Sequence, residues 1–269
     1  MSFVDRVRAR WRLVIVALVA LVVLALLGAA IFLLTPYTAD PDRLAAVEER
    51  EDVTLERVDG AVILTGGEVT AETTGIVLYP GARVEPESYA PTMAPLVAER
   101  DVLVVIPEMP LNLAVLDSNA ADDVMATHPE VDRWVVGGHS LGGAMACRYT
   151  AAHPDSADGL LLLAAYCDDG DDLRETDVPV LSIQGSEDGV IDAEAERENR
   201  ALLGDRSRIV EIDGMNHAQF GAYGDQRGDD PATIADHEAS DRLVERTLEW
   251  LDELEESPSV SVAAPAAAY

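Results

Sequence analysis

The stretch RWVVGGHSLGGAMA, from Arg133 to Ala146, places one serine between glycines directly after an apolar run. Its central segment GHSLG has the spacing G-x-S-x-G, follows a predicted strand and opens a predicted helix. In that setting the motif presents a serine hydroxyl at the carboxyl end of the strand. So sharp a turn strains the backbone at Ser140, and side chains at Gly138 or Gly142 would collide with the neighbouring strand and helix. We therefore expect Ser140 to be a nucleophile.

The sequence around this stretch alternates short apolar runs with helical patterns. The runs are rich in Val, Ile and Leu and are bounded by Gly, Pro or Asp: GAVILTG, TGIVLYPG, DVLVVIPE, DRWVVGG, DGLLLLAAY, VPVLSIQG and SRIVEIDG. Such runs are typical of strands buried on both faces. Segments with helical spacing separate several of them, namely ESYAPTMAPLVAER, SLGGAMACRYTAAH and AEAERENRALLG, and HEASDRLVERTLEWLDELEE follows the last run. The alternation predicts an α/β fold with a mostly parallel central sheet and helices on both faces.

A serine nucleophile needs a base, and the chain offers five histidines. His139 lies inside the sharp turn, His128 and His153 each precede a proline, and His237 lies at the acidic start of a predicted helix. His217, in IDGMNHAQFG, follows the last predicted strand, where a loop could carry it over the serine. We therefore expect His217 to be the general base.

The acid that orients this histidine is expected after the preceding strand. VPVLSIQGSEDGV ends a strand and then presents Glu187 and Asp188, so that Asp188 completes a serine, acid, histidine order along the chain. Asp168 and Asp169, which follow LLLLAAYC, are competing candidates. A carboxylate in either place could hold the imidazole tautomer and stabilise the imidazolium that forms during proton transfer.

From about Ala61 to Leu254 the chain resembles an α/β-hydrolase. YPGARV, MPLNLAV, GGHSLGGAMA, SEDGV and NHAQFGAYG together are similar to a small group of bacterial and archaeal proteins of the α/β-hydrolase superfamily, the fold-5-like group. The resemblance implies an oxyanion hole made of the backbone N–H groups of Leu141 and Ala82, with Gly81 as the alternative to Ala82.

The sequence also limits the substrate. Only CDDGDDLRETD separates the strand-forming LLLLAAY from VPVLSIQ, which leaves no room for a lid. An open site favours a small or medium, water-soluble ester or related acyl compound. Arg83 could recognise a substrate carboxylate or simply be solvated. Tyr79 and Asn216, together with Asn112 and Gln219, could line the pocket or make ordinary loop hydrogen bonds.

The charge of the chain is strongly acidic. Its 50 Asp and Glu residues oppose 19 basic residues, all of them Arg, which gives a formal net charge of −31. This balance excludes nucleic acid as a partner, because phosphate would be repelled. An acidic surface without Lys resembles the surfaces of salt-adapted, halophilic proteins. A coding bias for Arg is the alternative explanation.

The N-terminal part predicts a membrane anchor. Residues 13–34 carry no charge over a length that could cross a bilayer as a helix. Residues 1–12 hold four Arg, which by the positive-inside rule predicts a cytoplasmic N-terminus and an extracellular catalytic domain. A cleaved signal peptide is the alternative. We expect a connector over 35–52, the catalytic domain over 53–256 and a mobile tail over 257–269.

These observations predict a membrane-anchored serine hydrolase that cleaves an acyl substrate through an acyl-enzyme. No metal-ligand spacing, Gly-rich phosphate loop or nicotinamide fingerprint is present, so no cofactor or metal is expected. Alternatives are a catalytically silent binding protein at the cell surface, and an acyltransferase or C–C hydrolase on the same triad. Cys147 and Cys167 are expected to be buried free thiols, or a single bridge in an oxidising location.

Overall fold

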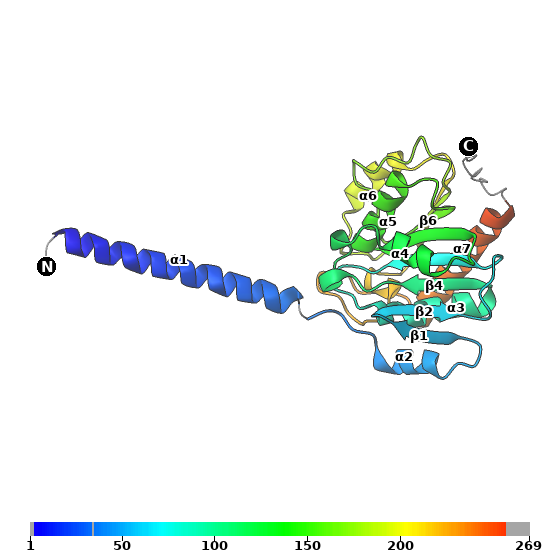
Figure 1. Ribbon diagram of the computed structural model, residues 1–269, viewed down its shortest axis with the longest axis horizontal. Helices are drawn as coiled ribbons and strands as arrows, with labels where there is room; N and C mark the ends of the chain where they lie inside the picture. The colour runs from blue at the N-terminus through cyan, green and yellow to red at the C-terminus, as the bar shows by residue number, and fades with distance from the viewer. Residues whose placement is uncertain (1–2, 34, 257–269) are drawn as a thin grey trace, which may run out of the picture. The chain divides into compact units, whose positions relative to one another are not determined.

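The computed structural model describes residues 3–33 and 35–256, in two units that meet between Pro36 and Tyr37. The predicted tail over 257–269 lies outside the described residues. The second unit is built on one eight-stranded sheet with helices beside it (Figure 1). The predicted α/β fold is confirmed in this unit.

The sheet has the strand order β1-β2-β4-β3-β5-β6-β7-β8. β2 pairs antiparallel with both β1 and β4, and every pairing from β4 through β8 is parallel. The inner strands β3, β4 and β6 are buried along their whole length, which explains their continuous Val, Ile and Leu runs. The strands are β1 (Thr54–Val58), β2 (Ala61–Thr65), β3 (Thr74–Tyr79), β4 (Val102–Ile106), β5 (Arg133–His139), β6 (Gly159–Leu163), β7 (Val180–Gly185) and β8 (Ser207–Ile212).

Helices cover both faces of the sheet, and each face has its own apolar core between the sheet and its helices. Successive residues of β3 alternate between the two cores, with Ile76 in the first and Val77 in the second. The first core lies beneath α2 (Pro41–Glu48), α3 (Ala90–Glu99) and α7 (Asp236–Glu256). The second lies beneath α4 (Ala120–Thr127) and α5 (Leu141–Ala152). The short helix α6 (Ala193–Asn199) follows β7 in the chain.

Within the segment predicted as a connector, 35–52, residues 37–52 belong to the second, folded unit. Tyr37 forms a parallel bridge with Val84, in which the Tyr37 amide donates to the Arg83 carbonyl at 2.6 Å. Val47 of α2 is buried against the first core. The sequence did not indicate α2, because the apolar contacts of a short helix are few and involve residues far apart in the chain.

The N-terminal unit contains one helix, α1 (Phe3–Leu33). Among the residues that the structure describes, none forms a helix both long and apolar enough to cross a membrane. Within α1, side-chain exposure is described for Trp11 and for residues 14–28. The predicted span, 13–34, therefore lies partly outside the described side chains. The membrane anchor and the cellular location therefore stay predictions.

The two cysteines form a disulfide, the second of the two states that the sequence left open. Cys147 lies on α5 and Cys167 lies in the loop after β6, with their Cα atoms 5.5 Å apart. That separation is within the range a disulfide requires. The bridge ties the helix that follows Ser140 to the loop after β6.

Candidate active site

Ser140 lies in the tight turn between β5 and α5. Its backbone has φ 53° and ψ −124°, a conformation that costs energy for any residue except glycine. The amide of Ser140 donates to the Leu163 carbonyl of β6 at 2.9 Å, which holds the turn against the sheet. The serine is partly exposed, whereas His139 before it is buried. The strained turn therefore presents the Ser140 side chain at the carboxyl end of the sheet.

The glycines on either side allow this close approach. A Cβ atom on Gly138 would lie 2.5 Å from the Gly142 carbonyl oxygen. A Cβ atom on Gly142 would lie 2.5 Å from the Pro80 carbonyl oxygen. Both contacts are with backbone, which cannot move aside, so the predicted reason for the two glycines is confirmed.

His217 and Asp188 are in direct contact. The Nδ1 atom of His217 lies 2.7 Å from Asp188 Oδ2, and the two side chains are 1% and 2% exposed. Asp188 Oδ1 accepts hydrogen bonds from the amides of Val190 and Ile191, both at 2.9 Å. Because a carboxylate only accepts, the proton of the neutral imidazole lies on Nδ1. Nε2 is then the atom able to accept a proton.

The Nε2 atom of His217 is buried and has no hydrogen-bond partner among the described residues. The imidazole of His139, next to Ser140 in the chain, lies 4.6 Å from that of His217 between ring centroids. The loop after β8 thus carries His217 against the turn that holds Ser140. A buried basic nitrogen without a partner in this position can take a proton from a group that enters the site.

The competing carboxylates lie elsewhere. Asp168 pairs with Arg148 of α5 at 3.1 Å, and both Asp168 and Asp169 are exposed. Among the described contacts, the carboxylate on the imidazole of His217 is that of Asp188. The geometry therefore favours Asp188.

In the loop after β3, the backbone amides of Gly81 and Ala82 differ in their hydrogen bonding. The Gly81 amide donates to the Tyr89 hydroxyl at 2.7 Å, so that N–H group is already used. Within the described residues, neither the Ala82 amide nor that of Leu141 at the first position of α5 has an acceptor. The packing of Gly142 on Pro80 brings the start of α5 to this loop. Ala82, rather than Gly81, thus has the free amide.

Tyr89 and His139 were not anticipated as site residues. Because the Tyr89 hydroxyl accepts from Gly81, its own proton points to His139 Nδ1 at 3.0 Å. Burial raises the pKa of Tyr89 and keeps its hydroxyl protonated. Burial, and then the charge of His217, hold the pKa of His139 well below 6.5. His139 is therefore a neutral ring between the nucleophile turn and the loop after β3.

The predicted substrate-contacting residues are placed differently. Tyr79 is fully buried, and its hydroxyl donates to the Ser118 carbonyl at 3.0 Å and accepts from the Ala121 amide at 2.9 Å, so it is a core residue. Arg83 has φ 61° and its guanidinium lies over the Tyr37 ring at 5.4 Å. Tyr79 is thus part of the core, and substrate recognition by Arg83 stays a prediction.

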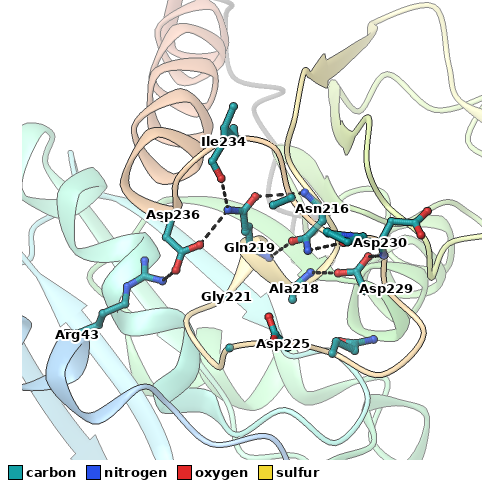
Figure 2. Close-up of a pocket in the computed structure, with 14 residues that line it drawn as sticks. Arg43, Asn216, Ala218, Gln219, Gly221, Asp225, Asp229, Asp230, Ile234 and Asp236 are labelled. Atoms are coloured by element: carbon teal, nitrogen blue, oxygen red, sulfur yellow. Dashed lines mark hydrogen bonds and ion pairs between the residues drawn. The ribbon is translucent and has the colours of Figure 1, made fainter.

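Asn216 belongs to a hydrogen-bonded turn beside His217. Its Nδ2 atom donates to the Asp230 carbonyl at 2.8 Å, and its Oδ1 atom accepts from the Gln219 amide at 3.2 Å. Both residues line a cavity of about 510 Å³ that also contacts Arg43 and Asp236 (Figure 2). Neither Ser140 nor His217 lines this cavity, although Asn216 and Ala218, on either side of His217, do.

Comparison with known proteins agrees with the fold. The Alpha/beta hydrolase family matches residues 75–241, more than half of the chain. No protein among the curated sequences matches. The chain is similar in structure to a predicted CIB-like hydrolase from Thermoplasma acidophilum, at 17% identity and a TM-score of 0.58, covering 75% of this chain and 98% of the other.

Two other solved structures have the same architecture. The alpha/beta hydrolase enzyme MGS-MChE2, from a metagenome of Mar Chica lagoon sediments, is 16% identical with a TM-score of 0.56, covering 75% of this chain and 99% of the other. Est1E from Butyrivibrio proteoclasticus is 14% identical with a TM-score of 0.54, covering 75% and 100%. At these identities the likeness shows the fold alone. The family match, which includes the turn at Ser140, shows that the chain belongs to the alpha/beta hydrolase family.

Proposed function

We propose that this alpha/beta hydrolase is a serine hydrolase that cleaves an ester-like acyl substrate through an acyl-enzyme. The observation that carries the proposal is the 2.7 Å contact between His217 Nδ1 and Asp188, which leaves a buried, unpartnered Nε2 beside the Ser140 turn. A serine hydroxyl becomes an effective nucleophile when an adjacent oriented base takes its proton. The three residues supply the nucleophile, the base and the orienting acid.

The reaction is a double displacement. The Ser140 hydroxyl gives its proton to His217 Nε2 while its oxygen attacks the acyl carbon, and the N–H groups of Leu141 and Ala82 bind the resulting oxyanion. The imidazolium then protonates the leaving alcohol, which departs and leaves an acyl group on Ser140. Water, deprotonated by His217, attacks this ester and releases the acid, so that the enzyme is regenerated.

The loops around the site favour a small or medium acyl substrate. Residues 164–179, between β6 and β7, contain no helix or strand that could form a lid. The loop after β4 exposes Leu111, Val115 and Leu116 by 53%, 48% and 54%. This loop is bonded to the loop after β3 through the Arg83 amide and the Asn112 carbonyl, 2.7 Å apart. Its apolar side chains could cover the apolar part of an acyl group.

The proposal is tested with a panel of esters, thioesters, lactones and amides of graded chain length. We expect hydrolysis of short and medium esters by the wild type and none by Ser140→Ala. Catalytic silence on the whole panel, together with retained ligand binding, would instead support a binding protein. Transfer of the acyl group to an added alcohol in preference to water would support an acyltransferase, and cleavage of a β-diketone would support a C–C hydrolase.

A further inference from the structure

Asp229 lies in the long loop between His217 and α7, and its carboxylate accepts four backbone hydrogen bonds. Oδ1 accepts from the amides of Gly189 at 3.0 Å, His217 at 3.3 Å and Asp230 at 3.0 Å. Oδ2 accepts from the amide of Ala218 at 2.8 Å (Figure 2). One side chain therefore binds the backbone next to Asp188 and the backbone of His217 itself.

We propose that Asp229 is a positioning residue that sets the distance and orientation between Asp188 and His217. The inference rests on the proposed function, because it assigns Asp229 to the same triad. Asp188 and His217 come from different loops, one after β7 and one after β8, so nothing in the local chain fixes their separation. The carboxylate of Asp229 bonds to Gly189 in the first loop and to His217 and Ala218 in the second.

The bonding pattern requires a carboxylate. All four partners are N–H donors, and an ionised carboxylate has acceptors only. Asparagine has the same shape but would turn an NH₂ group toward at least one of these amides. Hydrogen bonds to a charged acceptor are also about twice as strong as neutral ones. Asp229→Asn therefore weakens the link between the two loops without changing their packing.

Other contacts hold the two loops together when this link is weakened. The Glu187 amide donates to the Met215 carbonyl at 2.9 Å, and the Gly214 amide donates to the Ser186 hydroxyl at 2.8 Å. Asp229 itself is only half-buried. The Asp229→Asn variant is thus expected to fold, with a looser geometry between the acid and the base. A misplacement of about 1 Å in a catalytic group can cost on the order of 10² in rate.

The test compares Asp229→Asn with Asp225→Asn in the full chain. Asp225 lies in the same loop, is exposed and carries the same charge, so its variant controls for the lost charge. We measure kcat per site titrated with a fluorophosphonate, KM and melting temperature. We expect kcat per site to fall on the order of 10²-fold in Asp229→Asn, with KM within about twofold, and to be unchanged in Asp225→Asn. A purely structural role would lower the titratable fraction and leave kcat per site unchanged.

A second readout does not depend on activity. The proton between His217 Nδ1 and Asp188 gives a downfield NMR signal, which we expect to broaden or shift in Asp229→Asn and to stay in Asp225→Asn. A wild-type signal and a wild-type kcat per site in Asp229→Asn would overturn the proposal. If the wild type is inactive, the signal still tests Asp229 while the proposed function fails. If Asp229→Asn lacks a cooperative melt, Asp229→Glu replaces it, because glutamate keeps the charge but moves the carboxylate oxygens. We expect Asp229→Glu to lower kcat per site and to broaden or shift the NMR signal. Wild-type values of both in Asp229→Glu would also overturn the proposal.

Discussion

The imidazole Nδ1 of His217 lies 2.7 Å from the Oδ2 atom of Asp188, and both side chains are almost completely shielded from solvent. Since Asp188 Oδ1 already accepts two backbone amides, the carboxylate cannot rotate freely. The contact therefore fixes both the tautomer and the direction of the ring. The proposed chemistry at Ser140 depends on this arrangement.

The first prediction concerns the identity of the acid. Asp188→Asn presents an amide to His217, allows the wrong tautomer, and is expected to lower kcat by about 10⁴. Asp169→Asn is the matched control, because Asp169 is exposed and comes from the competing segment. Its kcat is expected to stay within about twofold of the wild type. Steady-state kinetics of both variants decide the point, and a crippled Asp169→Asn with an active Asp188→Asn would reassign the acid.

The second prediction concerns the loop that holds Ala82. Tyr89→Phe removes the acceptor of the Gly81 amide and the donor to His139, both of them buried. We expect a loss of about 1–3 kcal/mol of unfolding free energy and a fall in kcat of at least about tenfold, because an oxyanion donor is displaced. Tyr149→Phe removes a hydroxyl that contacts Asp122, away from the site. An equal fall in kcat in that control would show that the effect is not specific to the loop.

The third prediction uses the buried His139, whose pKa burial lowers well below 6.5. Below about pH 6.5 the unfolded chain binds a proton at this histidine that the folded chain does not. The free energy of unfolding therefore decreases as the pH is lowered below 6.5, by up to about 1.4 kcal/mol per pH unit from this group. His139→Asn keeps an acceptor for Tyr89 and removes the titration. Denaturant unfolding should show the gap between wild type and variant shrinking as the pH falls below 6.5; a constant gap would contradict the assignment.

A feature of this molecule can be predicted from the sequence when the residues that form it lie close together in the chain. The turn at Ser140 could be predicted because its glycines and serine lie within five residues and obey local steric rules. The buried strands could be predicted from their apolar runs. β1 (Thr54–Val58) could not, because it is an exposed edge strand whose polar sequence lacks that signal. Tyr79 was placed in the pocket because its burial depends on contacts with residues 118 and 121, which sequence spacing does not reveal.

Distance along the chain also explains why some site residues were missed. Asp229 is one acid among many in a strongly acidic chain, and only the folded loops show that its carboxylate meets the amides of Gly189 and His217. The pattern YPGARVEPESY contains Tyr89, yet its contact with His139 joins residues 50 apart. The disulfide likewise joins Cys147 and Cys167 across two elements. The one local signal for the Gly81–Tyr89 contact was the presence of a tyrosine eight residues after the Gly81 turn.

The fourth prediction concerns the net charge of −31. The described ion pairs lie mostly at the surface, where each contributes little, and the acids far outnumber the arginines. Added salt screens both kinds of interaction. The relief of repulsion among carboxylates should therefore outweigh the attraction that the ion pairs lose. The Debye length falls from about 10 Å at 0.1 M to about 3 Å at 1 M salt. We expect the melting temperature to rise over this range of KCl, and a flat or falling curve would remove the argument for salt adaptation.

The most direct test of the central claim is covalent labelling of the purified protein with a fluorophosphonate, followed by peptide mass spectrometry. We expect one adduct per chain, on the peptide that contains Ser140. We also expect a much slower reaction in His217→Ala and no adduct in Ser140→Ala, which should lose turnover by on the order of 10⁶. An adduct on another residue, or wild-type turnover of a true substrate by Ser140→Ala, would contradict the assignment of Ser140 as the nucleophile.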